Sequence, residues 1–304
     1  MLYLNDFVIL ILYMCLFPIH LLQELSGNVE HFRALERFMV KNNSKVEDIF
    51  CLNEINEQQM NLALKNINLD VLPMMTCLFV GPKNSFSLQN LKSLKIMRCE
   101  KLKIVFSTSM IRCLPQLVSI IIEECKELKQ MIEDDLENKT SSNFMSTTKT
   151  CFPKLETLAV VKCNKLKYVF PISICKELPA LNYLIIREAD ELEEIFGSEG
   201  DQKVKIRNLK VVAFVNLASL CHGQGIQFQA VKHRFIRNCQ KLSLASASTA
   251  DFENDLSAGL YIGTHSIQYF FKLLHVGSKI LHTICLKDIL TIESCKVAVR
   301  GMHA

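Results

Sequence analysis

LQNLKSLKIMRCEKLKIVF, residues 88–106, is the stretch whose apolar pattern recurs along the chain. Counted from residue 88, apolar side chains fall at offsets +3, +6, +8, +11, +14, +17 and +18. They are Leu91, Leu94, Ile96, Cys99, Leu102, Val105 and Phe106. The spacing of two between +6 and +8 is the period of a β-strand, in which alternate side chains share a face. One short strand is therefore predicted in this stretch, followed by a turn at the cysteine.

The same skeleton returns at several places in the chain. Units begin at Phe32, Leu88, Leu114, Phe152, Leu178, Ile206 and Phe228, and a weaker copy lies near residues 62–67. From residue 88 onward the spacings are 26, 38, 26, 28 and 22 residues. Offsets of three also suit an amphipathic helix, but runs such as SIIIEE and LAVVKC are β-branched and favour strands. A unit this small cannot bury its apolar face alone, so the units must stack.

The motif L-x-x-L-x-I-x-x-C-x-x-L, residues 91–102, matches the leucine-rich-repeat signature. The predicted fold class is α/β, a leucine-rich-repeat solenoid (horseshoe) with one short parallel strand per irregular repeat. We expect the array to span residues 28–243, with a polar loop at 133–150. Residues 244–304 are expected to form a degenerate tail with a candidate last repeat at 284–298.

Residues 1–27 form an apolar N-terminal segment around FVILILYMCLFPI. The apolar run is shorter than the roughly 20 residues that a membrane-spanning helix needs. It also follows Asp6 rather than a basic leader, which argues against a signal peptide. Three interpretations stay open: a cap against the first repeat, a weak signal or anchor, or the start of a truncated longer chain.

The charge balance and the cysteines limit the kinds of partner and compartment that can be expected. The chain has 35 basic and 31 acidic residues in mixed order, a net charge of +4, and no basic block, so no nucleic-acid partner is predicted. Five of its 13 cysteines share offset +11, which a disulfide framework would not require. Reduced, mostly buried thiols and a cytoplasmic location are predicted. These cysteines are Cys99, Cys125, Cys163, Cys239 and Cys295.

Motifs that carry catalysis are missing from the sequence. There is no GxSxG, HExxH, CxxC or phosphate-binding GxxxxGK[ST] motif. We therefore predict that the chain is not an enzyme and has no cofactor and no metal site.

The most promising binding positions are offsets +5, +7 and +9, which face away from the core on the concave side of such arrays. This row is unusually apolar from residue 121 to 215. Strand propensity alone could explain this, since β-branched residues suit strands on either face. An exposed apolar row could also mark a protein-binding surface. The candidate residues are Lys95, Met97, Ile121, Glu123, Val161, Tyr183, Ile185, Arg187, Phe235 and Arg237.

The segments LKSLKIMRCEKLKIVF, LETLAVVKCNKLKYVFP and LPALNYLIIREADELEEIF resemble one family in particular. They are similar to the C-terminal repeats of plant coiled-coil nucleotide-binding leucine-rich-repeat disease-resistance proteins, over roughly residues 30–243. The resemblance implies a protein-recognition module for defence. Its partner would be a pathogen effector, a guarded host protein or another receptor domain, with no membrane partner unless residues 1–27 act as an anchor. ATP binding does not carry over, because the phosphate-binding motif is missing, so a detached or truncated repeat region is expected. The alternative function is a repeat adaptor, such as the substrate-binding subunit of a ubiquitin ligase.

Overall fold

The computed structural model describes ten segments of the chain. They are residues 9–13, 35–51, 60–80, 86–111, 114–133, 151–171, 178–197, 206–220 without 207, 231, and 233–242. The chain divides into two compact units, residues 1–245 and 246–304, and every described residue belongs to the first unit. The predicted tail and the candidate repeat at 284–298 lie outside the described residues.

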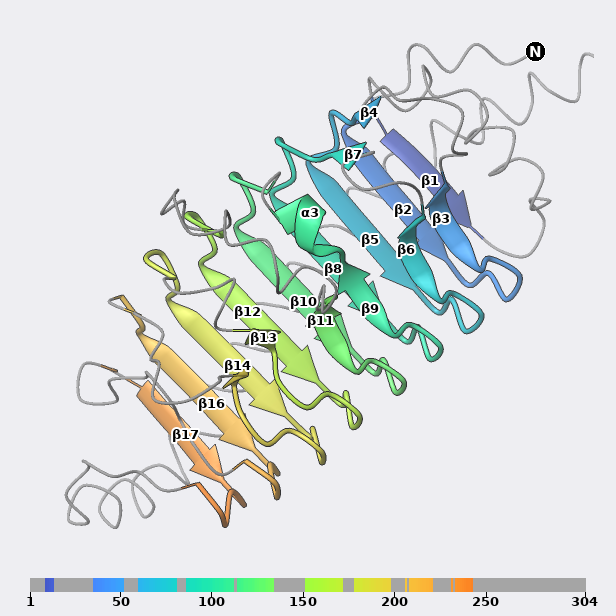
Figure 1. The fold of residues 1–304 in the computed structure, drawn as a ribbon. Helices are drawn as coiled ribbons and strands as arrows, with labels where there is room; N and C mark the ends of the chain where they lie inside the picture. Colours follow the sequence, from blue (N-terminus) through green and yellow to red (C-terminus); the bar gives the residue numbers. More distant parts are fainter. Residues whose placement is uncertain are drawn as a thin grey trace, which may run out of the picture. The chain divides into compact units, whose positions relative to one another are not determined.

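A parallel sheet of nine strands runs along the first unit (Figure 1). Each strand has five residues and pairs with the corresponding strand of the next repeat. In sheet order the strands are β1 (Ile9–Tyr13), β2 (Arg37–Lys41), β5 (Asn66–Asp70), β8 (Ser93–Met97), β10 (Ser119–Glu123), β12 (Thr157–Val161), β14 (Tyr183–Arg187), β16 (Val211–Val215) and β17 (His233–Arg237). The parallel repeat solenoid predicted from the spacing is confirmed.

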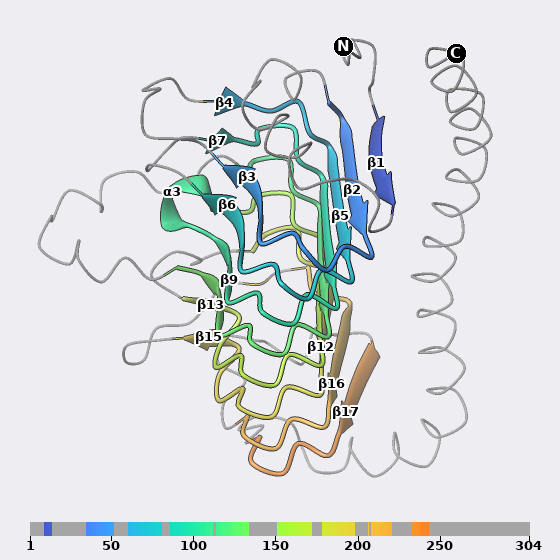
Figure 2. The same cartoon turned by 90° about the vertical axis from the view of Figure 1, so that its right-hand side faces the viewer.

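Short strands on the other side of the core pair with one another (Figure 2). The pairs are β3 (Asp48–Cys51) with β6 (Cys77–Val80), β4 (Met60–Asn61) with β7 (Phe86–Ser87), β9 (Ile104–Phe106) with β11 (Gln130–Ile132), and β13 (Phe170–Pro171) with β15 (Phe196–Gly197). Within the described residues the one helix is α3, Thr108–Ile111. The returning half of each repeat therefore contributes strands and turns much more than helix.

The core lies between the two sets of strands, and the apolar offsets fill it. In β8 the exposure pattern alternates, with Leu94 and Ile96 fully buried and Ser93, Lys95 and Met97 partly exposed. Phenylalanine rings add stacking on the far side, where the centroids of Phe152 and Phe170 lie 5.2 Å apart. Burying each large apolar side chain contributes about 1.5–3 kcal/mol. Since neighbouring repeats share this core, stacking is what stabilises each unit.

Strand β1 gives the apolar N-terminal segment a place in the sheet. It pairs with β2 in the repeat register, Leu10 opposite Phe38 and Leu12 opposite Val40. Cys15 then falls at offset +11, three residues beyond Leu12, as Cys99 lies three residues beyond Ile96. The segment thus contains the strand of a further repeat. No helix among the residues described is long and apolar enough to cross a membrane.

The weak copy near residue 62 is also a full repeat in the structure. Ile67 and Leu69 occupy offsets +6 and +8, opposite Leu94 and Ile96 of β8. At the other end Arg234 replaces the usual leucine, yet β17 still pairs in register with β16, Val212 opposite Arg234. Main-chain pairing therefore continues through the unit in which the sequence pattern begins to fail.

Each described turn that follows a strand of the nine-stranded sheet, from β2 to β17, contains one residue in the left-handed region. This residue lies at offset +10 in all eight described units, with φ between 52° and 56°. A side chain at positive φ is disfavoured, least so for asparagine and most for β-branched residues. The eight residues are Asn42, Val71, Arg98, Glu124, Lys162, Glu188, Asn216 and Asn238. This shared conformation turns the chain from each strand toward the residue at +11, which is a cysteine in four of the eight units.

Candidate functional site

The concave face is here the face of the nine-stranded sheet opposite the core. It consists of offsets +5, +7 and +9 of each strand, because alternate residues point to opposite sides of a sheet. The parallel pairing is in register throughout, so equal offsets lie side by side across the sheet. The concave face is therefore a grid in which each row combines side chains from different repeats.

Six of the predicted binding residues lie on this face and are partly exposed. They are Lys95 and Met97 of β8, Ile121 and Glu123 of β10, and Tyr183 and Arg187 of β14. The register brings Lys95 beside Ile121 and Met97 beside Glu123. Phe235 and Arg237 belong to β17, but their side chains lie outside the described residues. Nothing bound shows which of these residues contacts a partner, so their binding role stays a prediction.

Val161 and Ile185 differ from the expectation of exposure. Their exposed fractions are 8% and 2%, so both count as buried although they lie on the concave face. Ile185 sits between Ala159 and Ala213 of the neighbouring strands, which are also buried. The sequence pattern identifies the face but not how far its neighbours cover each side chain. The accessible apolar contacts are instead Met97 and Ile121.

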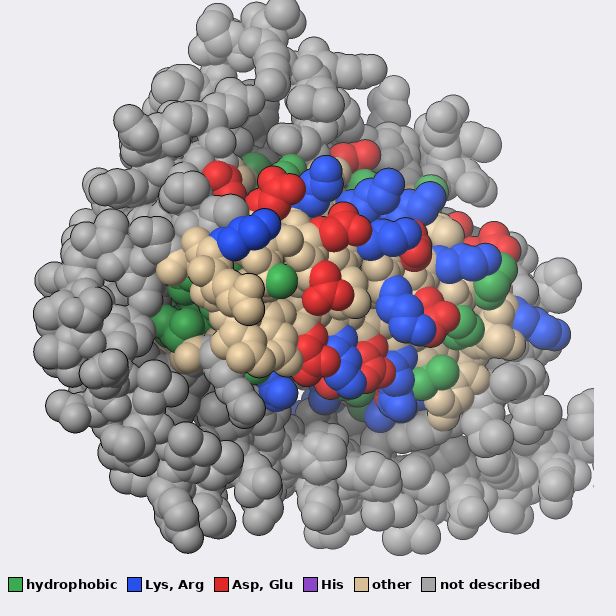
Figure 3. All heavy atoms as spheres, turned by 90° about the horizontal axis from the view of Figure 1, so that it is seen from below, with side chains coloured by type: hydrophobic (Ala, Val, Ile, Leu, Met, Phe, Trp, Pro, Cys, Tyr) green, Lys and Arg blue, Asp and Glu red, His purple; other side chains and the backbone are tan. Residues whose placement is uncertain are grey.

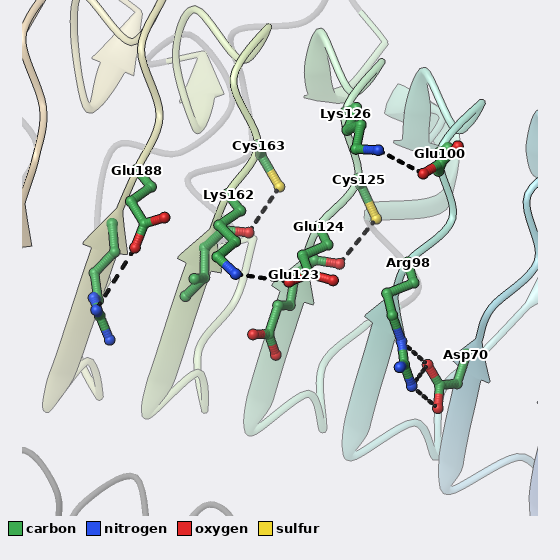
Figure 4. Close-up of polar contacts among 12 residues, drawn as sticks. Asp70, Arg98, Glu100, Glu123, Glu124, Cys125, Lys126, Lys162, Cys163 and Glu188 are labelled. Carbon is green, nitrogen blue, oxygen red and sulfur yellow. Dashed lines mark hydrogen bonds and ion pairs between the residues drawn. The ribbon is translucent and has the colours of Figure 1, made fainter.

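A chain of ion pairs runs along the turn edge, which the sequence analysis did not foresee (Figure 4). Arg98 donates three hydrogen bonds to the Asp70 carboxylate of the preceding repeat, at 2.7, 2.8 and 2.9 Å. Lys162 donates to Glu124 of its preceding repeat at 2.8 Å. With Glu188 next, the edge alternates in sign over five repeats: Asp70, Arg98, Glu124, Lys162 and Glu188.

These pairings shift the pKa values of the edge residues in the direction that favours the ionised forms. Hydrogen bonding to Asp70 raises the pKa of Arg98 above its ordinary value. Hydrogen bonding to Lys162 lowers the pKa of Glu124. Further along the same edge Lys126 pairs with Glu100 at 2.6 Å, and Lys165 pairs with Glu127 at 2.7 Å. Figure 3 shows basic and acidic side chains mixed on this side, with no patch of one sign. The edge neutralises itself and offers little net charge to a partner.

The cysteines at offset +11 are buried structural thiols. Cys99, Cys125 and Cys163 are free and fully buried. Each thiol approaches the carbonyl oxygen two residues before it, at 3.4, 3.6 and 3.5 Å. Hydrogen bonding between neighbouring thiols, together with burial, raises the pKa of Cys99 and of Cys125. A protonated, inaccessible thiol is a poor nucleophile. These cysteines therefore have a structural role in the turn and not a catalytic one.

Asn43 takes the same place in its own repeat. It is buried, and its side-chain oxygen accepts a hydrogen bond from the main-chain N–H of Lys45 at 3.0 Å. A small polar side chain inside the turn thus satisfies a backbone group that the sheet leaves free. In the part of the chain that the structure describes, no cluster of three His, Cys, Asp or Glu side chains could hold a metal ion.

In-register parallel strands and an apolar repeat skeleton define a leucine-rich-repeat solenoid. The chain belongs to the family of plant disease resistance protein RPS2-like leucine-rich repeats, whose family model matches residues 9–126 and 126–256. This match confirms the resemblance stated from the sequence.

Other comparisons add little. Over 106 residues the chain is 26% identical to a 33 kDa chaperonin from Prochlorococcus marinus (strain MIT 9515). The match covers 35% of this chain and 35% of that protein, so it spans about a third of the relative's length. No solved structure matches the chain.

Proposed function

We propose that the chain is a protein-recognition module of plant defence, which binds a protein partner through its concave face in the cytoplasm. The family supports the defence role, because it is a family of disease-resistance repeats. The free thiols of Cys99, Cys125 and Cys163 support a reducing compartment. The partner class is a pathogen effector, a guarded host protein or another receptor domain.

One contrast supports the concave face as the binding surface. Charged side chains of the turn edge largely pair with one another between repeats. The concave face instead has partly exposed Met97 and Ile121 beside the charged Glu123 and Lys95, and partly exposed Tyr183 two strands beyond β10. A mixture of apolar anchors and a few charged groups is typical of the centre of protein interfaces.

The test is capture of partners from plant leaf cells with the tagged chain and two matched variants. Ile121→Asp places a charge on the concave face, and Ile104→Asp places the same charge on the partly exposed first residue of β9, across the core. Both variants must first match the wild type in circular dichroism and thermal midpoint. We expect a partner that Ile121→Asp loses and Ile104→Asp keeps, and that binds again when both proteins are purified. If every captured protein responds equally to the two variants, the concave face is not the binding surface.

The same experiment separates the adaptor alternative. A ubiquitin-ligase subunit would bring down the ligase core proteins, and both variants would retain them because the core would bind elsewhere. Defence output in leaves expressing the chain provides an independent measurement. We expect it to be changed by Ile121→Asp and unchanged by Ile104→Asp.

A further inference from the structure

Among the described residues, two polar atoms in the middle row of the concave face make no hydrogen bond: the side-chain oxygen of Asn68 and the ammonium of Lys95. Asn68 of β5 and Lys95 of β8 both lie at offset +7 and are paired in register. The side-chain oxygen of Asn68 is buried and accepts no hydrogen bond. Within the described residues Lys95 makes neither a hydrogen bond nor an ion pair. Burial lowers the pKa of Lys95, partly offset by the nearby Glu123 carboxylate.

This pair is an exception among the polar groups nearby. Asp70, two residues after Asn68, is fully engaged by Arg98. Buried polar atoms in proteins nearly always have partners, and those that lack one often mark a functional site. The Asn68 oxygen, which lacks a donor, and the Lys95 ammonium, which lacks an acceptor, lie on adjacent strands and together form a candidate two-point binding site, named the socket.

The charge around the socket indicates the sign of its ligand. On the concave positions of β2, β5 and β8 the basic residues are Arg37, Lys41 and Lys95. The carboxylates on these positions and on the neighbouring β10 are Asp70, which Arg98 already neutralises, and Glu123. With Lys41 left aside, Arg37 and Lys95 still exceed Glu123 by one positive charge, which favours an acidic ligand.

The spacing and the neighbours indicate a peptide. Asn68 and Lys95 lie on adjacent strands about 4.8 Å apart, so one extended residue lying across both strands can place its main-chain N–H near one side chain and its carboxylate near the other. Met39 lies beside Asn68 and Ile121 beside Lys95 in the same row, so the socket has an apolar neighbour on each side.

We propose that Asn68 and Lys95 form a subsite for one acidic residue of an extended partner segment, flanked in that segment by apolar residues. The main-chain N–H of the acidic residue donates to the Asn68 oxygen, and its carboxylate accepts from the Lys95 ammonium. Met39 and Ile121 contact the flanking apolar side chains. This subsite rests on the proposed function, since it assigns the kind of partner segment that the concave face takes.

The test uses NMR of the full chain after reductive methylation of its lysines with ¹³C, which preserves their charge. The Lys95 signal is assigned with Lys95→Arg. The probes are acetyl-Leu-Glu-Leu-amide and its neutral match acetyl-Leu-Gln-Leu-amide, with sodium acetate as a free carboxylate. We expect the acidic peptide to shift the Lys95 signal in a saturable way, at least tenfold more tightly than either control. The signals of the paired Lys126 and Lys162 should not move.

Two variants test the roles of the subsite residues. Asn68→Asp places a carboxylate beside Lys95, so we expect it to abolish the peptide-induced shift and to raise the pKa of Lys95. Lys162→Met removes a paired lysine of the turn edge and should leave the titration unchanged. If Asn68→Asp does not fold, Lys95→Met is examined from the peptide side by saturation transfer and should show at least a fivefold loss of binding.

The proposal is overturned if the acidic peptide leaves the Lys95 signal unmoved even at a large molar excess over the protein. Equal shifts with the neutral peptide or with acetate would also overturn it, as would an unchanged response of Asn68→Asp. Failure of the subsite can be told apart from failure of the proposed function. If a captured partner depends on Ile121 but binds Lys95→Met with wild-type affinity, binding by the concave face is supported and the subsite is wrong. If no partner depends on Ile121, the proposed function itself is wrong.

Discussion

Replacing Arg98 by methionine should destabilise the array through Asp70. The Asp70 side chain is 9% exposed and accepts three hydrogen bonds from Arg98, whose own side chain is 51% exposed. Removing one partner of a buried ion pair costs about 3–5 kcal/mol, whereas an exposed pair contributes about 0.2–1 kcal/mol. With one partner buried and the other half exposed, we expect a loss of about 2 kcal/mol in the free energy of unfolding. Methionine keeps the strained backbone at φ 52°, so that strain cancels in the comparison.

Urea unfolding followed by circular dichroism measures this loss, since the chain has no tryptophan. In a domain of this size the thermal midpoint should fall by about 4–8 °C. The double variant Asp70→Asn/Arg98→Met removes the stranded charge, so its stability should lie well above the sum of the two single losses. We expect a coupling energy of at least about 1 kcal/mol. A loss below about 0.5 kcal/mol for Arg98→Met, or strict additivity in the cycle, would refute the reasoning.

Three further predictions test other features of the repeat. Val71→Asn replaces a β-branched residue at φ 55° with the residue used at three other +10 positions, so unfolding in urea should show a gain of about 0.5–1 kcal/mol, and a loss would contradict the strain argument. A Cβ on Gly197 would lie 2.8 Å from the Tyr168 ring, so Gly197→Ala should cost about 1–2 kcal/mol in the same assay, and the cost should vanish in a Tyr168→Ala background. The pKa of Glu124 is lower in the folded chain than its ordinary value of about 4.3. The wild type should therefore be more stable than Glu124→Gln at every pH above that value. This difference in stability should disappear as the pH falls through the folded pKa of Glu124, and a difference that persists in acid would argue against the Lys162 pair.

The repeat architecture could be predicted because its cause is local. Five-residue strands at offsets +5 to +9 follow from the +6 and +8 pair, as in β8, where Leu94 and Ile96 are buried. The burial of the +11 residue also follows from spacing, because this offset is fully buried whether it holds Cys99, Leu72 or Leu217.

Other features depend on neighbours that spacing cannot identify. Glu124 and Lys162 are 38 residues apart, and only the stacking of their turns shows that they pair. The burial of Ile185 depends on what surrounds it and not on its own offset. The sequence does not mark β1 as a strand, because Ile9–Tyr13 is apolar throughout and lacks the alternation of polar and apolar residues that identifies a strand.

The central claim is that a protein partner binds the concave face. The most direct measurement is the calorimetric affinity of a captured and purified partner for the wild type, Ile121→Asp and Ile104→Asp. We predict that Ile121→Asp weakens binding at least tenfold, about 1.4 kcal/mol, and that Ile104→Asp stays within twofold of the wild type. Equal affinities for the wild type and Ile121→Asp, or an equal loss for both variants, would contradict the claim.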